Sequence, residues 1–165
     1  MTKPSIRVGV STCLLGENVR YDGGHKKDHF LTDVLNHWVE YVPVCPEVEM
    51  GMGTPRPPIQ LVHDGNEVQL VAPSSGENFT DRMRTYSEQR VTELQSIDLD
   101  GYVLKRGSPS CGMAGIAVHK DGIEVHRNNS GIFAETLMSR WPGLPVEEEG
   151  RLNDADLREN FIERI

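Results

Sequence analysis

The sequence predicts an α/β protein, a three-layer sandwich built around a mostly parallel, Rossmann-like sheet. Two observations carry this prediction. Short apolar segments typical of buried strands alternate along the chain with segments whose apolar residues recur at helical spacing. Three of the strand-like segments also run directly into polar loops rich in glycine or proline, as strands of a parallel sheet do where they end.

The first half of the chain predicts a strand, a helix and a second strand. Ile6–Ser11 is apolar enough for a buried strand, and Glu40–Val44 for the next one. Between them, one helical face collects Phe30, Leu31, Val34, Leu35 and Trp38. The polar loop Thr12–Asp28 is too long for a simple connector and is expected to bind a ligand. Cys45–Ile59 holds four prolines and two glycines, which argue against any regular element and predict a rigid wall.

Two β-hairpins are expected in the second half. Gln60–His63 and Glu67–Val71 flank an Asp-Gly-Asn turn, and Ile116–His119 and Ile123–His126 flank Lys-Asp-Gly.

The remaining elements of the second half complete the alternation of helices and strands. Asn78 is expected to cap a helix that runs to about Ser96, and Tyr102–Lys105 is the third strand. A further helix capped by Asn129 or Ser130 is stopped by Pro142. Leu144–Val146 follows as the last strand, a charged tail begins at Glu147, and an amphipathic helix spans Asn153–Ile165.

Length and charge limit the domain count and the partners. The chain has 165 residues, which predicts a single α/β catalytic domain over residues 1–150, with the helix of residues 151–165 part of it or appended to it. The net charge of −8 argues against binding a nucleic acid polymer or an anionic membrane surface. No apolar run is long enough to span a bilayer, and the N-terminus lacks the features of a signal peptide. A cytoplasmic location is therefore expected.

All three cysteines follow predicted strands: Cys13, Cys45 and Cys111. The carboxyl ends of parallel strands meet at one edge of the sheet, so these thiols are expected to converge there. Three interpretations stay open at this point: a shared metal site, separate core thiols, or a single catalytic thiol. Three thiolates suit a [4Fe–4S] cluster with one open iron, or a zinc ion that also holds a water. The spacing from Cys13 to Arg20 is one residue too long for the phosphate loop of small tyrosine phosphatases.

Three long motifs carry a resemblance to a known family. They are STCLLGENVRYDGGHK (Ser11–Lys26), VCPEVEMGMGTPRPPI (Val44–Ile59) and LKRGSPSCG (Leu104–Gly112), in this order, and LPVEEEGRLND extends the likeness towards the end. On these motifs the chain resembles the bacterial thiouracil desulfidase family, long catalogued as a domain of unknown function.

The resemblance implies a [4Fe–4S] cluster held by Cys13, Cys45 and Cys111. Its open iron would bind the sulfur of a thiolated pyrimidine, and the reaction would replace C=S by C=O and release sulfide without net redox chemistry. The substrate would be a free base, or alternatively a thiouridine monophosphate. A module of another class, in which a cluster or zinc ion senses redox state, is the alternative to an enzyme. The oligomeric state is open.

The same motifs suggest which residues would act. Glu47, two residues past Cys45, is the expected acid/base, with Glu49 as the alternative because residues 45, 47 and 49 share a face of an extended segment. Ser108 is expected to hydrogen-bond substrate or water, and Ser110 either to do the same or to satisfy the turn backbone. Substrate binding is assigned to a further set in the matched loops: Arg20, Tyr21, Lys26, Arg56 and Lys105, with the basic residues available for a phosphate and the tyrosine for stacking on the ring.

Overall fold

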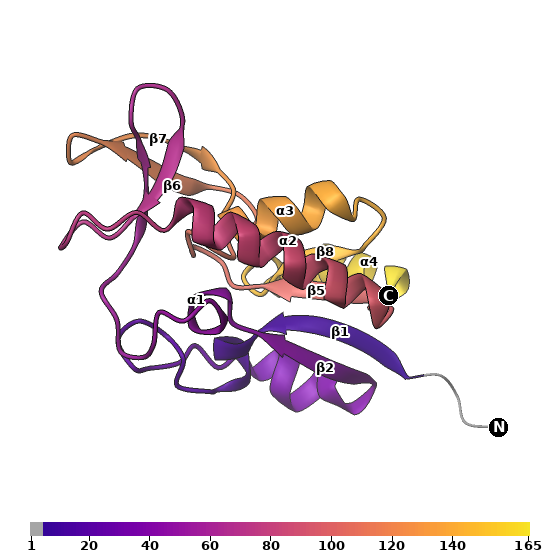
Figure 1. The fold of residues 1–165 in the computed structure, drawn as a ribbon. Coiled ribbons are helices and arrows are strands. Elements are labelled where there is room, and N and C mark those ends of the chain that lie inside the picture. The colour runs from indigo at the N-terminus through magenta and orange to yellow at the C-terminus, as the bar shows by residue number, and fades with distance from the viewer. Residues whose placement is uncertain (1–4) are drawn as a thin grey trace.

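A four-stranded parallel sheet forms the centre of the protein (Figure 1). The computed structural model describes residues 5–165. The strand order is β2 (Val39–Val44), β1 (Ile6–Ser11), β5 (Gly101–Leu104) and β8 (Val146–Glu148), and each neighbouring pair is parallel. All carboxyl ends therefore lie at one edge, as the sequence predicted.

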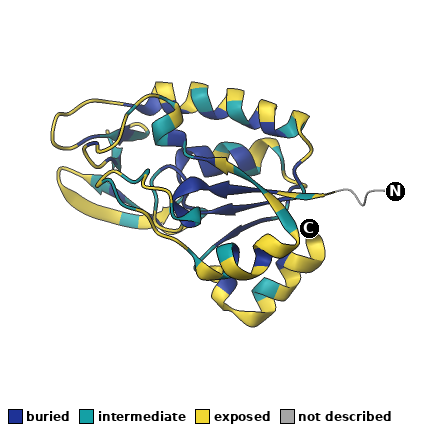
Figure 2. Cartoon of the chain, turned by 90° about the horizontal axis from the view of Figure 1, so that it is seen from below, coloured by how far each residue is buried: buried dark blue, intermediate teal, exposed yellow. Residues whose placement is uncertain are grey.

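Helices cover both faces of this sheet, which confirms the predicted three layers. On one face, α2 (Thr80–Ser96) and α3 (Ile132–Arg140) pack over Tyr102 and Leu104 of β5. On the other face, the segment from Phe30 to His37 and α4 (Ala155–Arg164) enclose the side chains of β1. Figure 2 shows the strands as the buried layer between helices whose outer faces are exposed.

Close packing inside the sheet explains one glycine. The ring of Tyr102 lies where a side chain on Gly9 would project, only 2.3 Å from an added Cβ atom. A larger residue at position 9 would therefore displace a fully buried tyrosine from the core.

A second four-stranded sheet projects from the end of the molecule opposite the two termini (Figure 1). Both predicted hairpins are confirmed: β3 (Gln60–His63) pairs with β4 (Val68–Val71), and β6 (Ile116–Lys120) pairs with β7 (Ile123–Asn129). The sequence did not predict that β3 and β6 would pair in parallel and join the hairpins into one sheet.

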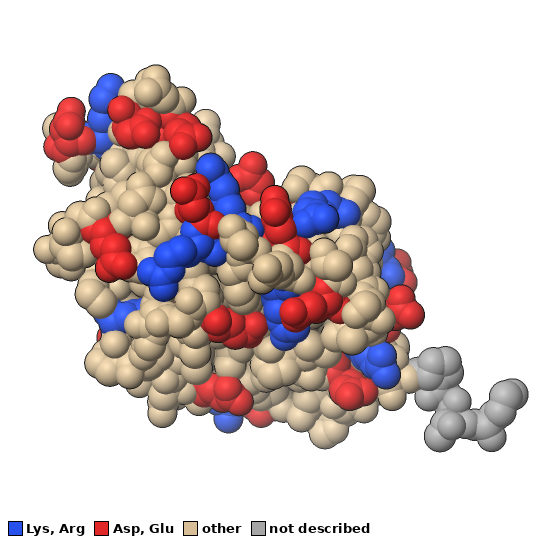
Figure 3. Space-filling model, in the orientation of Figure 1, with Lys and Arg blue, Asp and Glu red and all other residues tan. Residues whose placement is uncertain are grey.

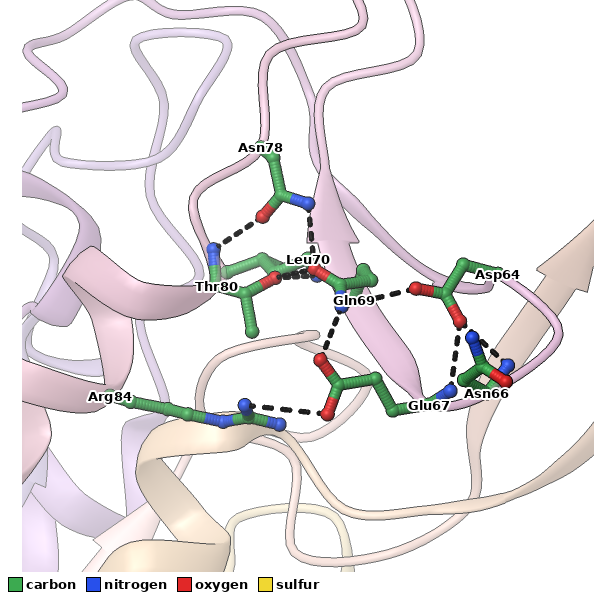
Figure 4. Close-up of polar contacts among 8 residues, drawn as sticks. All are labelled: Asp64, Asn66, Glu67, Gln69, Leu70, Asn78, Thr80 and Arg84. Atoms are coloured by element: carbon green, nitrogen blue, oxygen red, sulfur yellow. Dashed lines mark hydrogen bonds and ion pairs between the residues drawn. The ribbon is translucent and has the colours of Figure 1, made fainter.

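Polar side chains tie β4 of this second sheet to the start of α2 (Figure 4). The Oε1 atom of Gln69 accepts from Asn78 Nδ2 at 2.6 Å and from Thr80 Oγ1 at 3.0 Å. The Thr80 hydroxyl oxygen in turn accepts from the backbone N–H of Leu70 at 2.7 Å. Because Thr80 is buried, these bonds satisfy polar groups that water does not reach.

The predicted helix around residues 30–38 is irregular. A π-helical turn, Phe30–Val34, runs into a 3₁₀ turn, Leu35–His37. The change of pitch keeps Leu31 and Leu35 in the core but exposes Val34 and Trp38, which had been expected on the same apolar face.

Three element boundaries also differ from prediction. The backbone N-cap of α2 is Phe79, while the Asn78 side chain accepts from Thr80 N–H. Helix α3 starts after Gly131 because Asn129 still belongs to β7. The last strand lies two residues later than predicted, so Glu147 and Glu148 are buried instead of opening a charged tail.

Charge on the surface is mixed. On the face shown in Figure 3, acidic and basic side chains alternate over the helices and the hairpins. Among residues 5–165, none of the helices has the length and apolar character needed to cross a bilayer.

Candidate functional site

The three cysteines meet at the carboxyl edge of the parallel sheet. Cys13 lies in a 3₁₀ turn, Thr12–Leu15, that follows β1 directly. Cys45 follows β2 and is the N-cap of α1 (Pro46–Glu49). Cys111 lies in the loop between β5 and β6. All three line one cavity of about 260 Å³, although they are far apart in the sequence.

Burial keeps these thiols protonated in the metal-free protein. It raises the pKa of Cys13 to about 11, against an opposing effect of the Lys105 ammonium group. Burial likewise raises the pKa of Cys45, and that of Cys111 well above the usual range for a thiol. A metal that binds here must therefore displace protons from the sulfur atoms.

Helix α1 places Glu47 in the wall of the same cavity. Both carboxylate oxygens accept a hydrogen bond: Oε1 from Arg56 Nε at 2.9 Å and Oε2 from Ser110 Oγ at 3.0 Å. The Arg56 side chain is 4% exposed and that of Glu47 is 14% exposed, so this ion pair is nearly enclosed. Two bonds fix the carboxylate, and each oxygen keeps a further lone pair.

Glu49 has a different position. The sequence did not predict the short helix α1, because the prolines of this loop were interpreted as helix breakers. Pro46, however, occupies the first helical turn, where proline is favoured. Residues 47 and 49 therefore point to different sides instead of sharing a face. Glu49 accepts from Cys45 N–H at 2.9 Å and from Tyr86 Oη of α2 at 2.8 Å, and it does not line the cavity.

The two serines beside Cys111 have separate tasks. Ser108 lines the cavity, and its Oγ atom accepts from the N–H groups of Ser110 and Cys111 at 3.1 and 3.0 Å. Within residues 5–165 its hydroxyl donates to no other group, so the proton can be donated to a ligand. Ser110 is completely buried behind the wall and donates to Glu47, so the structure does not place it as a residue that touches substrate.

Four of the five residues expected to bind substrate from the matched loops line the cavity: Arg20, Tyr21, Arg56 and Lys105. The Arg20 guanidinium lies over the Tyr21 ring, 5.6 Å from its centroid. Lys105 Nζ is 3.6 Å from Glu149, and Arg56 uses its side chain to hold Glu47. Lys26 is exposed and does not line the cavity, and its backbone N–H donates to the Cys13 carbonyl.

Sequence reasoning missed three residues that support the site. Ser11 lines the cavity, accepts from Lys105 N–H at 2.9 Å, and its hydroxyl opposes the rise in the pKa of Cys111. Glu148 and Glu149 bond to the backbone of the Cys111 loop. The charge of the two glutamates was interpreted as that of a solvated tail, although both lie within the LPVEEEGRLND segment that shares the family likeness.

Comparisons with known proteins identify the family and agree with the overall fold. The family model described as 2-thiouracil desulfurase matches residues 8–149. A Bacillus subtilis (strain 168) protein, described as the uncharacterized protein YbbK, is 29% identical over 150 residues, which cover 88% of this chain and 97% of that protein. A solved structure described as the [4Fe-4S]-dependent thiouracil desulfidase TudS is similar with a TM-score of 0.71 and 30% identity, covering 94% of this chain and 99% of that one. The chain therefore belongs to the 2-thiouracil desulfurase family.

Proposed function

We propose that this protein is a [4Fe–4S]-dependent desulfidase that converts a thiolated pyrimidine, such as thiouracil, into the oxygen analogue and sulfide. The observation that carries the proposal is that Cys13, Cys45, Cys111 and the enclosed carboxylate of Glu47 line one cavity. Membership of the family and likeness to TudS over 94% of the chain support it.

The donor set suits an iron–sulfur cluster. Cys13, Cys45 and Cys111 offer three soft sulfur ligands around one cavity, and the nearby charge of Lys105 favours the thiolate of Cys13. Among residues 5–165, no three Cys, His, Asp or Glu side chains converge on a point that could hold a single ion. In a cluster, each cysteine binds a different iron, so the sulfur atoms need to surround a volume instead of meeting at a point. When bound, the cluster would supply an open, soft iron for the thiocarbonyl sulfur, which makes the attached carbon more electrophilic.

Glu47 is the proposed acid/base residue. It would accept a proton from the attacking water as the water oxygen bonds to the thiocarbonyl carbon, and pass that proton to the sulfur. It would then take the second proton from the new hydroxyl group as the carbonyl forms, and pass this one to the departing sulfide as well. The C–S bond breaks with its electron pair on sulfur, so water and the thiocarbonyl become a carbonyl and hydrogen sulfide without oxidation or reduction. Arg56 and Ser110 would hold the carboxylate in place throughout.

Ser108 and the residues at the cavity mouth are proposed to hold the substrate. The free hydroxyl proton of Ser108 can be donated to the pyrimidine oxygen or to water. Tyr21 offers a ring face for stacking, and Arg20 beside it offers a charge for the phosphate of a thiouridine monophosphate, which is the second candidate substrate.

The first test is anaerobic iron and acid-labile sulfide analysis of the reconstituted wild type and of Cys111→Ser. We expect about four irons and four sulfides per chain in the wild type and loss of both in the variant. Zinc in place of iron, or no metal after reconstitution, would contradict the proposal, and zinc would favour a sensing module instead.

The second test separates catalysis from cluster binding. Glu47→Gln should keep the iron and the visible spectrum of the wild type but lose sulfide release by about 100-fold or more. Thiouracil and thiouridine monophosphate are compared as substrates, with Arg20→Ala as the variant expected to lose activity on the nucleotide alone. Full activity of Glu47→Gln on both substrates would refute its assigned role.

A further inference from the structure

Two consecutive glutamates at the end of β8 bond to the two ends of the loop that carries Cys111. Glu149 Oε1 accepts from the backbone N–H of Arg106 at 2.6 Å, where the loop leaves β5. Glu148 Oε2 accepts from the backbone N–H of Met113 at 2.9 Å, two residues beyond Cys111. The parallel register of Leu104 with Glu148 brings both carboxylates beside the loop.

Burial of the Glu148 carboxylate is unfavourable unless its contacts compensate for the hydration that it loses. Glu148 is 6% exposed, and within the described part of the chain its carboxylate receives one hydrogen bond, from Met113. An ionised carboxylate that is taken out of water loses much of its favourable hydration. Its neighbour Glu147 is equally buried but pairs with Arg151, at 2.8 Å from Nε. The hydrogen bond from Met113 of the loop is therefore the contact that accounts for the buried position of Glu148.

The opposite side of the loop is fixed by the start of α3. The N–H groups of Ile132 and Ala134 donate to the carbonyls of Pro109 and Ser110, each at 3.1 Å. Gly131 approaches so closely that an added Cβ would lie 2.5 Å from the carbonyl carbon of Ser110. The loop is therefore held between α3 on one side and the two glutamates on the other.

Glu149 also connects the loop to a second cysteine. Its carboxylate lies 3.6 Å from Lys105 Nζ, and the Lys105 charge acts on Cys13. Lys105 and Arg106 both line the cavity. A change at Glu149 would therefore release both the start of the loop and a lysine beside the thiols.

We propose that Glu148 and Glu149 are positioning residues that hold the loop from Lys105 to Met113 so that the Cys111 sulfur stays at the cavity. The significance for a cluster rests on the proposed function, in which Cys111 is a ligand. The position of the loop itself can be measured with or without metal.

The experiment compares the full-length wild type with Glu148→Ala, Glu148→Gln and Glu149→Ala, and uses Asp154→Ala, which removes the cap of α4, as the control. In the reduced, metal-free protein, the alkylation rate of each cysteine is measured by mass spectrometry. We expect Cys111 in Glu148→Ala and Glu149→Ala to react about tenfold faster relative to Cys45, as loss of a hydrogen bond to a charged group implies. Glu148→Gln should stay near the wild type because its amide oxygen still accepts from Met113 N–H.

The control and a second measurement separate positioning from general destabilisation. Asp154→Ala should melt at a lower temperature but leave the relative rate at Cys111 unchanged. In the anaerobically reconstituted proteins, iron loss to a chelator should be fastest in the two variants with a loosened loop. Equal rates at Cys111 in Glu148→Ala and Asp154→Ala, or an unchanged rate in Glu149→Ala, would overturn the proposal. The expected alkylation pattern in a protein that takes up no iron would support the positioning role and refute the proposed function.

Discussion

The enclosed ion pair between Arg56 and Glu47 should be the most sensitive point of the site to a single substitution. Arg56→Met removes the guanidinium that donates to Glu47 Oε1 and to the carbonyl of Gly53. It leaves an ionised carboxylate in a wall where its side chain is only 14% exposed. The substitution therefore leaves the desolvated charge of Glu47 without its partner, and it also removes the packing of the Arg56 side chain.

The burial of the Arg56–Glu47 ion pair determines how much Arg56→Met should destabilise the protein. Removing one partner of a buried pair typically costs 3–5 kcal/mol, and here the lower end, about 3 kcal/mol, applies because Glu47 keeps its bond from Ser110 and borders the cavity. For a chain of this size, that change should lower the melting temperature by about 6–12 °C.

Urea and thermal unfolding of the reduced, metal-free proteins provide the assay. The double variant Arg56→Met/Glu47→Gln should be less destabilised than the sum of the single variants, because the second change removes the stranded charge. Arg127→Met is the matched control, since Arg127 forms an exposed pair with Glu124 and its loss should be hard to detect. Equal destabilisation at positions 56 and 127, or strict additivity in the double variant, would refute the reasoning.

Four further changes test other parts of the structure. Gly131→Ala should lower the melting temperature and speed alkylation of Cys111, because its Cβ would meet the Ser110 backbone. Ser11→Ala should cost about 1–3 kcal/mol in urea unfolding, since it leaves the Lys105 N–H without its acceptor. Asp154→Ala should lower the melting temperature by about 2–4 °C, because the aspartate caps α4 by accepting from Asp156 and Leu157. Burial raises the pKa of Glu149 above 4.5, so the folded state retains a proton that the unfolded state has lost. Stability should therefore fall as pH rises from 4.5 through the raised pKa, and Glu149→Gln should remove this component of the pH profile.

The sequence predicted the parts of this fold that depend on local pattern. Apolar runs identified β1, β2 and β5, and the turn residues identified both hairpins. The rule that parallel strands end at one edge then predicted that Cys13, Cys45 and Cys111 would line a common cavity.

The features that the sequence did not reveal depend on long-range contacts. The pairing of Leu61 with Val118 creates the second sheet, but no local pattern specifies which hairpins meet. Glu148 is acidic and follows a short apolar segment, so it resembles a solvated residue until the loop with Met113 folds against it. Pro46 is compatible with two opposite predictions, since proline ends a helix in its interior but favours one at its start.

The short helix α1 links cluster binding to catalysis in the proposed function. Cys45 caps the helix and Glu47 lies in its first turn, so the chain itself fixes their separation. Glu49 then bonds the Cys45 N–H and reaches Tyr86 of α2, which ties this unit to the main core. Cys45, the proposed ligand, and Glu47, the proposed acid/base, lie on the same helical turn and therefore move together. Thermal motion changes their distances from Cys13 and Cys111 more than it changes the distance between the two of them. Because Arg56 and Ser110 hold Glu47 from outside the turn, they limit that remaining motion, and the substrate carbon and the carboxylate can stay aligned during the reaction.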